Sequence, residues 1–175
     1  SLWARNTIGK KKLAPTKEAE HRGMTPSTGW ALVGAQFGLL AALIVVPAGE
    51  LWGRGVLALG FGGTLIVLGL LIVVAAGFRL GPSLTPLPIP KDDGVLVTEG
   101  FFRYVRHPIY SGVLLAALGI VIAQASLAHI VGWLFLLGVL TLKAVGEERM
   151  LAEKYEGYAI YSDTTGRFFP RRARR

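Results

Sequence analysis

Residues 55–78 read GVLALGFGGTLIVLGLLIVVAAGF, an apolar stretch without a single charged residue. A helix of this length is about 36 Å long, enough to cross the roughly 30 Å of bilayer hydrocarbon. A second apolar stretch, residues 29–46, is also long enough and ends at Pro47. Because 52% of the 175 residues are hydrophobic and only 17% are charged, we expect an integral membrane protein.

A third apolar stretch covers residues 109–142 and is interrupted only weakly, at Gln124-Ala125-Ser126. One helix of that length would measure about 50 Å, far more than a bilayer needs. Two helices in a tight hairpin fit better, although each is short for a full crossing. The sequence therefore predicts an all-α integral membrane fold with four transmembrane helices, at about 29–46, 55–78, 109–124 and 127–143.

We expect one domain, residues 29–175, after a polar and basic tail at residues 1–28. Met24 lies just before the apolar sequence, which leaves open whether residues 1–23 are native. Small residues allow membrane helices to approach closely. We therefore interpret the glycines of the first two spans as helix contacts rather than as a phosphate-binding loop: Gly34, Gly38, Gly60, Gly62, Gly63 and Gly69.

The positive charges are distributed very unevenly. Of the 19 Lys and Arg residues, six lie in the N-terminal tail, four in residues 79–108, and eight from Lys143 onward, which leaves only Arg54 elsewhere. Four spans place the three rich segments on one side, which the positive-inside rule makes cytoplasmic. The net charge of +8 favours membrane lipids as partners over nucleic acid. There is no cysteine, and the scattered His21, His107 and His129 do not suggest a metal site.

The segment Arg106-His107-Pro108-Ile109-Tyr110-Ser111-Gly112 begins the third span. Proline suits the first turn of a helix, so His107 falls near the N-cap. Free backbone amides, the positive end of the helix dipole and Arg106 then meet at one point, which suits a carboxylate or phosphate. Taken alone, the segment also fits a plain helix start with interfacial Arg and Tyr side chains.

Three further features accompany it on the same side. Glu147-Glu148 follows the last span and could bind an ammonium group or hydroxyls, or simply be a solvated helix end. Tyr155, Tyr158 and Tyr161 recur at spacing three, near one stripe of a helix, and suit membrane anchoring equally well. Residues 94–102, GVLVTEGFF, form an apolar loop that needs backbone partners or a planar ligand.

Taken in order, these motifs resemble the isoprenylcysteine carboxyl methyltransferases and the related phospholipid N-methyltransferases, over roughly residues 79–170. The resemblance implies a membrane methyltransferase whose S-adenosylmethionine lies in a cytosolic pocket formed by the loop, the helix start and the C-terminal helical tail. A lipophilic small-molecule substrate would enter from the bilayer. By position, the implied cofactor contacts are Val95, Leu96, Val97, Phe102, His107, Pro108, Ile109, Tyr110 and Glu147. Arg106 is added as a cofactor contact because of its place at the helix start. The expected substrate contacts are Lys143, Glu148 and Arg167.

Lys143 stands where the eukaryotic enzymes of that family have a substrate-binding Arg, and Gly94 and Phe102 replace a His and a Tyr. These departures argue against a prenylcysteine carboxylate. The acceptor stays open between an isoprenoid or lipid carboxylate, an amine and a thiol, and no residue is assigned as a base. Two alternatives remain: an NADPH-dependent sterol-type membrane reductase and a non-enzymatic four-helix membrane scaffold.

Overall fold

The computed structural model describes residues 24–87, 89 and 95–171. Within these ranges the chain is helical and has no strand; an isolated parallel bridge joins Val105 and Gly166. The expectations for residues 1–23 and for Gly94 fall outside the described residues. In chain order, the elements are α2 (Pro26–Val45), α3 (Val56–Leu80), η1 (Gly81–Ser83), η2 (Gly100–Arg103), α4 (Pro108–Gln124), α5 (Leu127–Lys154) and α6 (Tyr158–Thr164).

Each predicted apolar stretch forms a helix, and local chemistry explains the helix ends. The Thr25 side chain accepts a hydrogen bond from the amide of Thr28 and caps α2. Ala125 adopts the left-handed conformation, with φ 49°, between α4 and α5. This residue breaks the long apolar stretch into the predicted hairpin, since a left-handed residue ends a helix.

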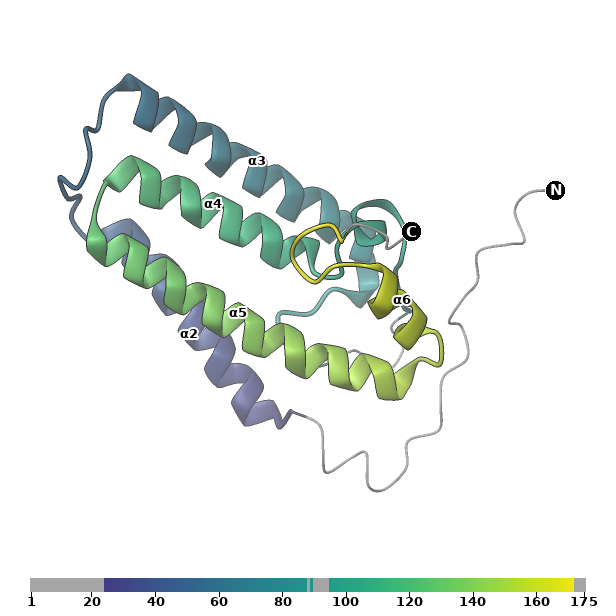
Figure 1. Cartoon of the computed structure of the whole chain (residues 1–175). Helices are drawn as coiled ribbons and strands as arrows, with labels where there is room; N and C mark the ends of the chain where they lie inside the picture. Colours follow the sequence, from purple (N-terminus) through teal and green to yellow (C-terminus); the bar gives the residue numbers. More distant parts are fainter. Residues whose placement is uncertain (1–23, 88, 90–94, 172–175) are drawn as a thin grey trace.

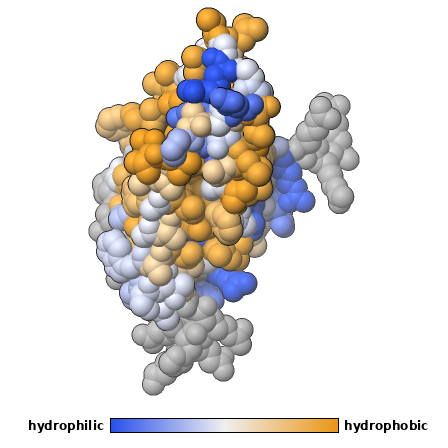
Figure 2. All heavy atoms as spheres, turned by 90° about the vertical axis from the view of Figure 1, so that its left-hand side faces the viewer, coloured by the Kyte–Doolittle hydropathy of each residue, from blue (hydrophilic) through white to orange (hydrophobic). Residues whose placement is uncertain are grey.

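Three helices, α2, α3 and α5, are long and apolar enough to cross a membrane. α4 has 17 residues and is therefore only about 26 Å long, so a four-span crossing stays a prediction. Large apolar side chains are exposed along the helices, among them Leu57 and Ile44. Seen from the end where α3 begins, much of the coloured surface is hydrophobic, with hydrophilic residues in separate patches (Figure 2). Such a surface suits lipid as the solvent.

α3, α4, α5 and α2 follow one another across the molecule (Figure 1). α3 packs closely on α4 along two pairs of glycines. A Cβ atom on Gly62 would lie 2.6 Å from the carbonyl oxygen of Gly119, and one on Gly69 would lie 2.5 Å from that of Gly112. This seam confirms the predicted close packing for Gly62 and Gly69.

The other four glycines named above do not make such contacts. A Cβ atom on Gly34, Gly38, Gly60 or Gly63 would have no described neighbour within 4 Å. For these four the predicted helix contact is wrong, because they lie on helix faces that no other described element covers.

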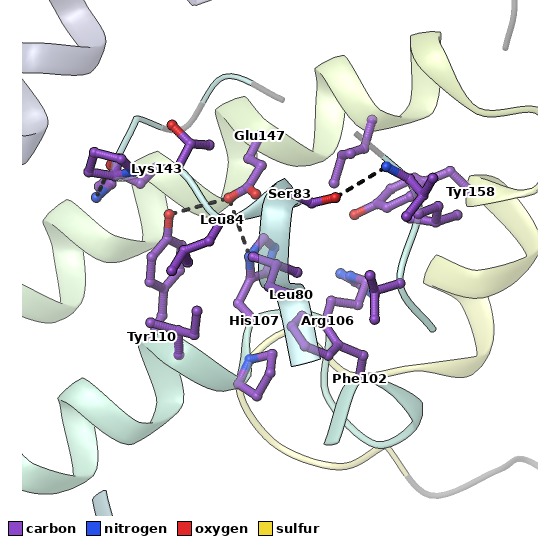
Figure 3. A pocket seen from close by; sticks show the side chains of 18 of the residues that line it. Leu80, Ser83, Leu84, Phe102, Arg106, His107, Tyr110, Lys143, Glu147 and Tyr158 are labelled. Carbon is purple, nitrogen blue, oxygen red and sulfur yellow. Dashed lines mark hydrogen bonds and ion pairs between the residues drawn. The ribbon is translucent and has the colours of Figure 1, made fainter. Parts of the chain in front are cut away.

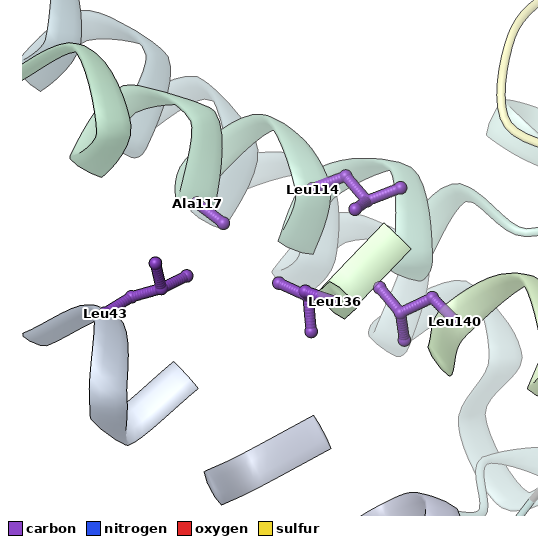
Figure 4. Close-up of a cluster of buried hydrophobic side chains, with 5 residues drawn as sticks. All are labelled: Leu43, Leu114, Ala117, Leu136 and Leu140. Atoms are coloured by element: carbon purple, nitrogen blue, oxygen red, sulfur yellow. The ribbon is translucent and has the colours of Figure 1, made fainter. Parts of the chain in front are cut away.

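α2 packs mainly on α5. The buried cluster that joins them with α4 consists of Leu43, Leu114, Ala117, Leu136 and Leu140 (Figure 4). Since lipid is as apolar as these side chains, the cluster stabilises the bundle through close packing rather than through the hydrophobic effect.

The linker between α2 and α3 lies against the last turn of α4. The amides of Gly49 and Leu51 donate to the carbonyls of Gln124 and Ala125, at 2.8 and 2.9 Å. Two side chains complete the arrangement: Trp52 donates to the carbonyl of Ile122 at 2.8 Å and Arg54 to that of Ala123 at 3.1 Å. The carbonyls at the end of α4 therefore have partners, as a helix end within a membrane requires.

Candidate functional site

A cavity of about 320 Å³ lies where α3 ends, α4 begins and α5 leaves the bundle (Figure 3). This volume is at the lower end of the range for small-molecule sites. Every residue that the sequence predicted as a cofactor contact lines the cavity: Val95, Leu96, Val97, Phe102, Arg106, His107, Pro108, Ile109, Tyr110 and Glu147. Of the predicted substrate contacts, Lys143 lines it, whereas Glu148 and Arg167 do not.

The start of α4 is fixed by the C-terminal tail. The amides of Arg106 and His107 donate to the carbonyls of Gly166 and Arg167, at 2.8 and 3.1 Å. His107 is the N-cap of α4, as predicted, and Pro108 is its first residue. The amides of Ile109 and Tyr110 have no backbone partner among the described residues. They are therefore free to bind an acceptor group at the positive end of the helix dipole.

Glu148 holds three basic side chains together beside the cavity. Its Oε1 atom lies 3.1 Å from Arg106 Nε, 3.1 Å from His107 Nε2 and 2.9 Å from Arg167 Nε, and its Oε2 lies 2.8 Å from Arg167 Nη2. Arg106 Nη1 also donates to the carbonyls of Ser162 and Thr165. These contacts connect α5, the start of α4 and the tail, so Glu148 has a structural task in this cluster. Substrate contacts by Glu148 and Arg167 remain predictions.

Glu147, in contrast, faces the cavity. Its Oε2 atom accepts a hydrogen bond from the Tyr110 hydroxyl at 3.3 Å and lies 3.6 Å from His107 Nδ1. The rings of His107 and Tyr110 are stacked, with centroids 5.3 Å apart. His107 therefore lies between the two carboxylates, one at each ring nitrogen, as Figure 3 shows for Glu147. His107 and Glu147 line the same small cavity, as predicted.

Lys143 lies almost completely buried, with 2% of its surface exposed. Its ammonium donates to Gln36 Oε1 at 2.6 Å and to the carbonyl of Pro86 at 3.3 Å, and it lies 5.2 Å from the centre of the Tyr110 ring. No carboxylate forms an ion pair with it within the described ranges. Gln36 was not predicted as a site residue, because its only signal in the sequence is a lone amide side chain within an apolar span.

The three tyrosines reach the cavity from two elements rather than from one helical stripe, so that prediction is wrong. α5 ends at Lys154, Tyr155 is extended, and α6 begins at Tyr158 after Gly157. All three tyrosines line the cavity, and the Tyr161 hydroxyl donates to the carbonyl of Phe102 at 2.6 Å.

The Tyr158 hydroxyl is buried and has no hydrogen-bond partner among the described residues. Burial, and to a lesser degree the negative charge of Glu148, raises the pKa of Tyr158 above its ordinary value. The hydroxyl therefore stays protonated and can donate to a ligand.

The remaining wall comes from the loop after α3. The amide of Val95 donates to Ser83 Oγ at 3.2 Å, which holds residues 95–97 against η1. Residues 95–98 have no regular secondary structure, as predicted for an apolar loop. The other residues that line this wall were not predicted from the sequence: Leu80, Ser83, Leu84, Thr85 and Pro86.

Comparisons with known proteins agree with this arrangement of motifs. The family model described as phospholipid methyltransferase matches residues 57–157, more than half of the chain. An uncharacterized protein of Schizosaccharomyces pombe is 41% identical over 78 residues, which are 41% of this chain and 23% of that protein. The chain thus spans about a quarter of the length of that relative.

Proposed function

We propose, since this chain belongs to the phospholipid methyltransferase family, that it transfers a methyl group from S-adenosylmethionine to a lipophilic acceptor at the cytoplasmic face of the membrane. Membership of the family and the three long apolar helices support methyl transfer by an integral membrane protein. The activity, the methyl donor, the membrane face and the acceptor are all part of the proposal. The observation that supports them is the single cavity shared by His107, Tyr110 and Glu147.

The cavity offers fitting partners for several polar groups of S-adenosylmethionine. The free amides of Ile109 and Tyr110, with Arg106 beside them, suit the methionine carboxylate. Glu147 suits the amino group or the ribose hydroxyls, because its carboxylate reaches the cavity. The hydroxyl of Tyr158, which has no partner among the described residues, can donate a further hydrogen bond to S-adenosylmethionine.

When bound, S-adenosylmethionine supplies an activated methyl group on a positively charged sulfur. The residues of this chain then have to align the acceptor and exclude water, and positioning alone can supply about 7–11 kcal/mol of a barrier. An anionic acceptor needs no base, whereas an ammonium must first lose a proton. We assign no residue as a base.

The acceptor would approach from the bilayer. Phe37 of α2 and Leu84 of the loop line the cavity, and both are well exposed at the surface. An apolar chain lying between them would leave its polar end beside Lys143. This path supports a lipophilic acceptor and the predicted substrate role of Lys143.

Titration of the purified protein in detergent with S-adenosylmethionine and, separately, with NADPH tests the proposal. We expect the methyl donor to bind, and we expect its affinity to fall at least tenfold in His107→Ala and Glu147→Ala. The exposed Glu153 on the same helix provides the matched control, Glu153→Ala. Binding of NADPH alone would favour the reductase, and undiminished donor affinity in both site variants would refute the assignment.

The acceptor can be sought directly by incubating membrane lipid extracts with isotope-labelled donor, with and without the protein. A labelled lipid that forms only with the active protein supports the proposed reaction. Absence of any labelled lipid, while the donor binds, would refute the proposed acceptor class.

A further inference from the structure

The end of the cavity formed by α2 and α5 contains two donor groups with unused N–H bonds, the Lys143 ammonium and the Gln36 amide. The Lys143 ammonium has three N–H groups, and two acceptors are present, Gln36 Oε1 and the Pro86 carbonyl. The amide nitrogen of Gln36 has no hydrogen-bond partner within the described residues, and Gln36 is buried yet lines the cavity. One ammonium N–H and the amide NH₂ are therefore available at the same place.

No carboxylate forms a direct ion pair with Lys143 within the described residues, although the charge of Glu147 acts on it from one helical turn away. Lys143 is buried, and the acceptors that it contacts are neutral amide and carbonyl oxygens. A buried cation without a direct ion pair is unfavourable, so an anion that contacts the ammonium here would gain a favourable partner. Glu147, one helical turn away, also lines the cavity, but its carboxylate bonds to Tyr110 and faces His107.

The two ends of the cavity therefore differ in chemistry. Figure 3 shows Lys143 and Tyr110 on one side of Glu147 and Tyr158 on the other. Arg106, Glu147 and Tyr158 are the proposed contacts of S-adenosylmethionine. The Lys143 end of the cavity is therefore left for the methyl acceptor.

We propose that Gln36 and Lys143 together form a subsite for an anionic oxygen group of the lipophilic acceptor, a carboxylate or a phosphate, and that Gln36 determines this specificity. The neutral amide leaves the Lys143 charge available, whereas a carboxylate at position 36 would neutralise it. A lipophilic amine without an anionic group is disfavoured, because the buried ammonium repels it. In naming an acceptor, the proposal rests on the proposed methyl transfer.

The two kinds of anion correspond to different reactions. If the carboxylate is itself the acceptor, its oxygen forms the new O–CH₃ bond while the S–CH₃ bond breaks and leaves its electron pair on sulfur. The product is a neutral methyl ester, and no proton is released. If a phosphate anchors a lipid whose amine accepts the methyl group, the phosphate is unchanged and the amine releases one proton to solvent.

Two substitutions separate charge from hydrogen bonding at position 36. In Gln36→Glu the new carboxylate replaces an oxygen that lies 2.6 Å from Lys143 Nζ, so the two side chains should form an internal ion pair. Gln36→Met removes the amide but keeps the length and the free Lys143 charge. Binding of oleate, dioleoyl phosphatidic acid and oleylamine is measured in nonionic micelles, together with binding of S-adenosylmethionine.

We expect the unmodified protein to bind oleate or the phosphatidic acid at least tenfold more tightly than oleylamine, and the stronger of the two anions identifies the anionic group. Gln36→Glu should lose at least tenfold in anion affinity, Gln36→Met less, and neither should change the affinity for the methyl donor. Oleylamine binding as tightly as the anions, or unchanged anion affinity in Gln36→Glu, would overturn the subsite. If the protein prefers anions but does not bind S-adenosylmethionine, the proposed subsite is supported and the methyltransferase proposal is refuted.

Discussion

Replacement of Glu148 by Gln should loosen the contacts that hold α5, the start of α4 and the C-terminal tail together. The Glu148 and Arg106 side chains are only 13% and 11% exposed. Removing one partner of a buried ion pair costs about 3–5 kcal/mol. Gln keeps one acceptor oxygen, which reduces the expected cost. The Arg167 side chain is 36% exposed, so its share is below about 1 kcal/mol. Only Arg167 joins Glu148 directly to the tail, so we expect tail docking to weaken by up to about 1 kcal/mol, and the larger loss to fall on the contact between α5 and the start of α4.

A loss of about 1 kcal/mol in docking raises the undocked population by up to about fivefold, since 1.4 kcal/mol corresponds to a factor of ten. Limited trypsin digestion in detergent measures it, because cleavage after Arg167 tracks the open population when opening is fast. Donor affinity should fall as well, because Arg106 and His107 lose the carboxylate that orients them. Glu153→Gln, the same chemical change at an exposed position of α5, serves as the control. Equal cleavage rates and equal donor affinities in the two variants would refute the structural task of Glu148.

Three other substitutions test the seam, the cavity and the helix end. Gly69→Leu should disrupt the α3–α4 contact and lower the detergent melting temperature by several degrees, whereas Gly63→Leu, which meets open space, should not; similar melting would contradict the seam. Tyr158→Phe should leave stability unchanged, because its buried hydroxyl has no described partner, but should weaken donor binding severalfold in a titration; unchanged binding would remove this contact. Trp52→Phe should cost about 1 kcal/mol in thermal unfolding through loss of the bond to Ile122, and no change would show that water replaces it.

The helices and the turn at Ala125 could be predicted because apolar length and a weak interruption determine them locally. Which helices pack against each other could not be predicted. Gly34 and Gly69 have the same sequence context of apolar neighbours, yet only Gly69 meets another helix, since the choice depends on how α3 lies against α4. The single tyrosine stripe failed because the chain leaves the helical conformation at Tyr155, before α6 begins.

The candidate site, too, could be predicted only in part. The helix start at His107 and the Glu147-Glu148 pair follow from local motifs, and the resemblance to a family brought them together. Adjacent helical residues point about 100° apart, so only Glu147 of the pair faces the cavity, and the motif alone does not say which residue does. Gln36 lies more than 100 residues before Lys143 in the sequence, and a lone amide in an apolar span has no local pattern that reveals its partner.

The glycine seam also determines which part of the bundle can move. Backbone atoms of α3 and α4 touch at Gly62–Gly119 and Gly69–Gly112, so these helices can separate only by giving up contacts along their whole length. α2 has no comparable attachment to α3 and rests mainly on α5. If a lipid tail enters from the bilayer, α2 is therefore the helix that can move aside, while α3 and α4 stay together. The hydrogen bond between Gln36 of α2 and Lys143 of α5 is then the contact that has to break.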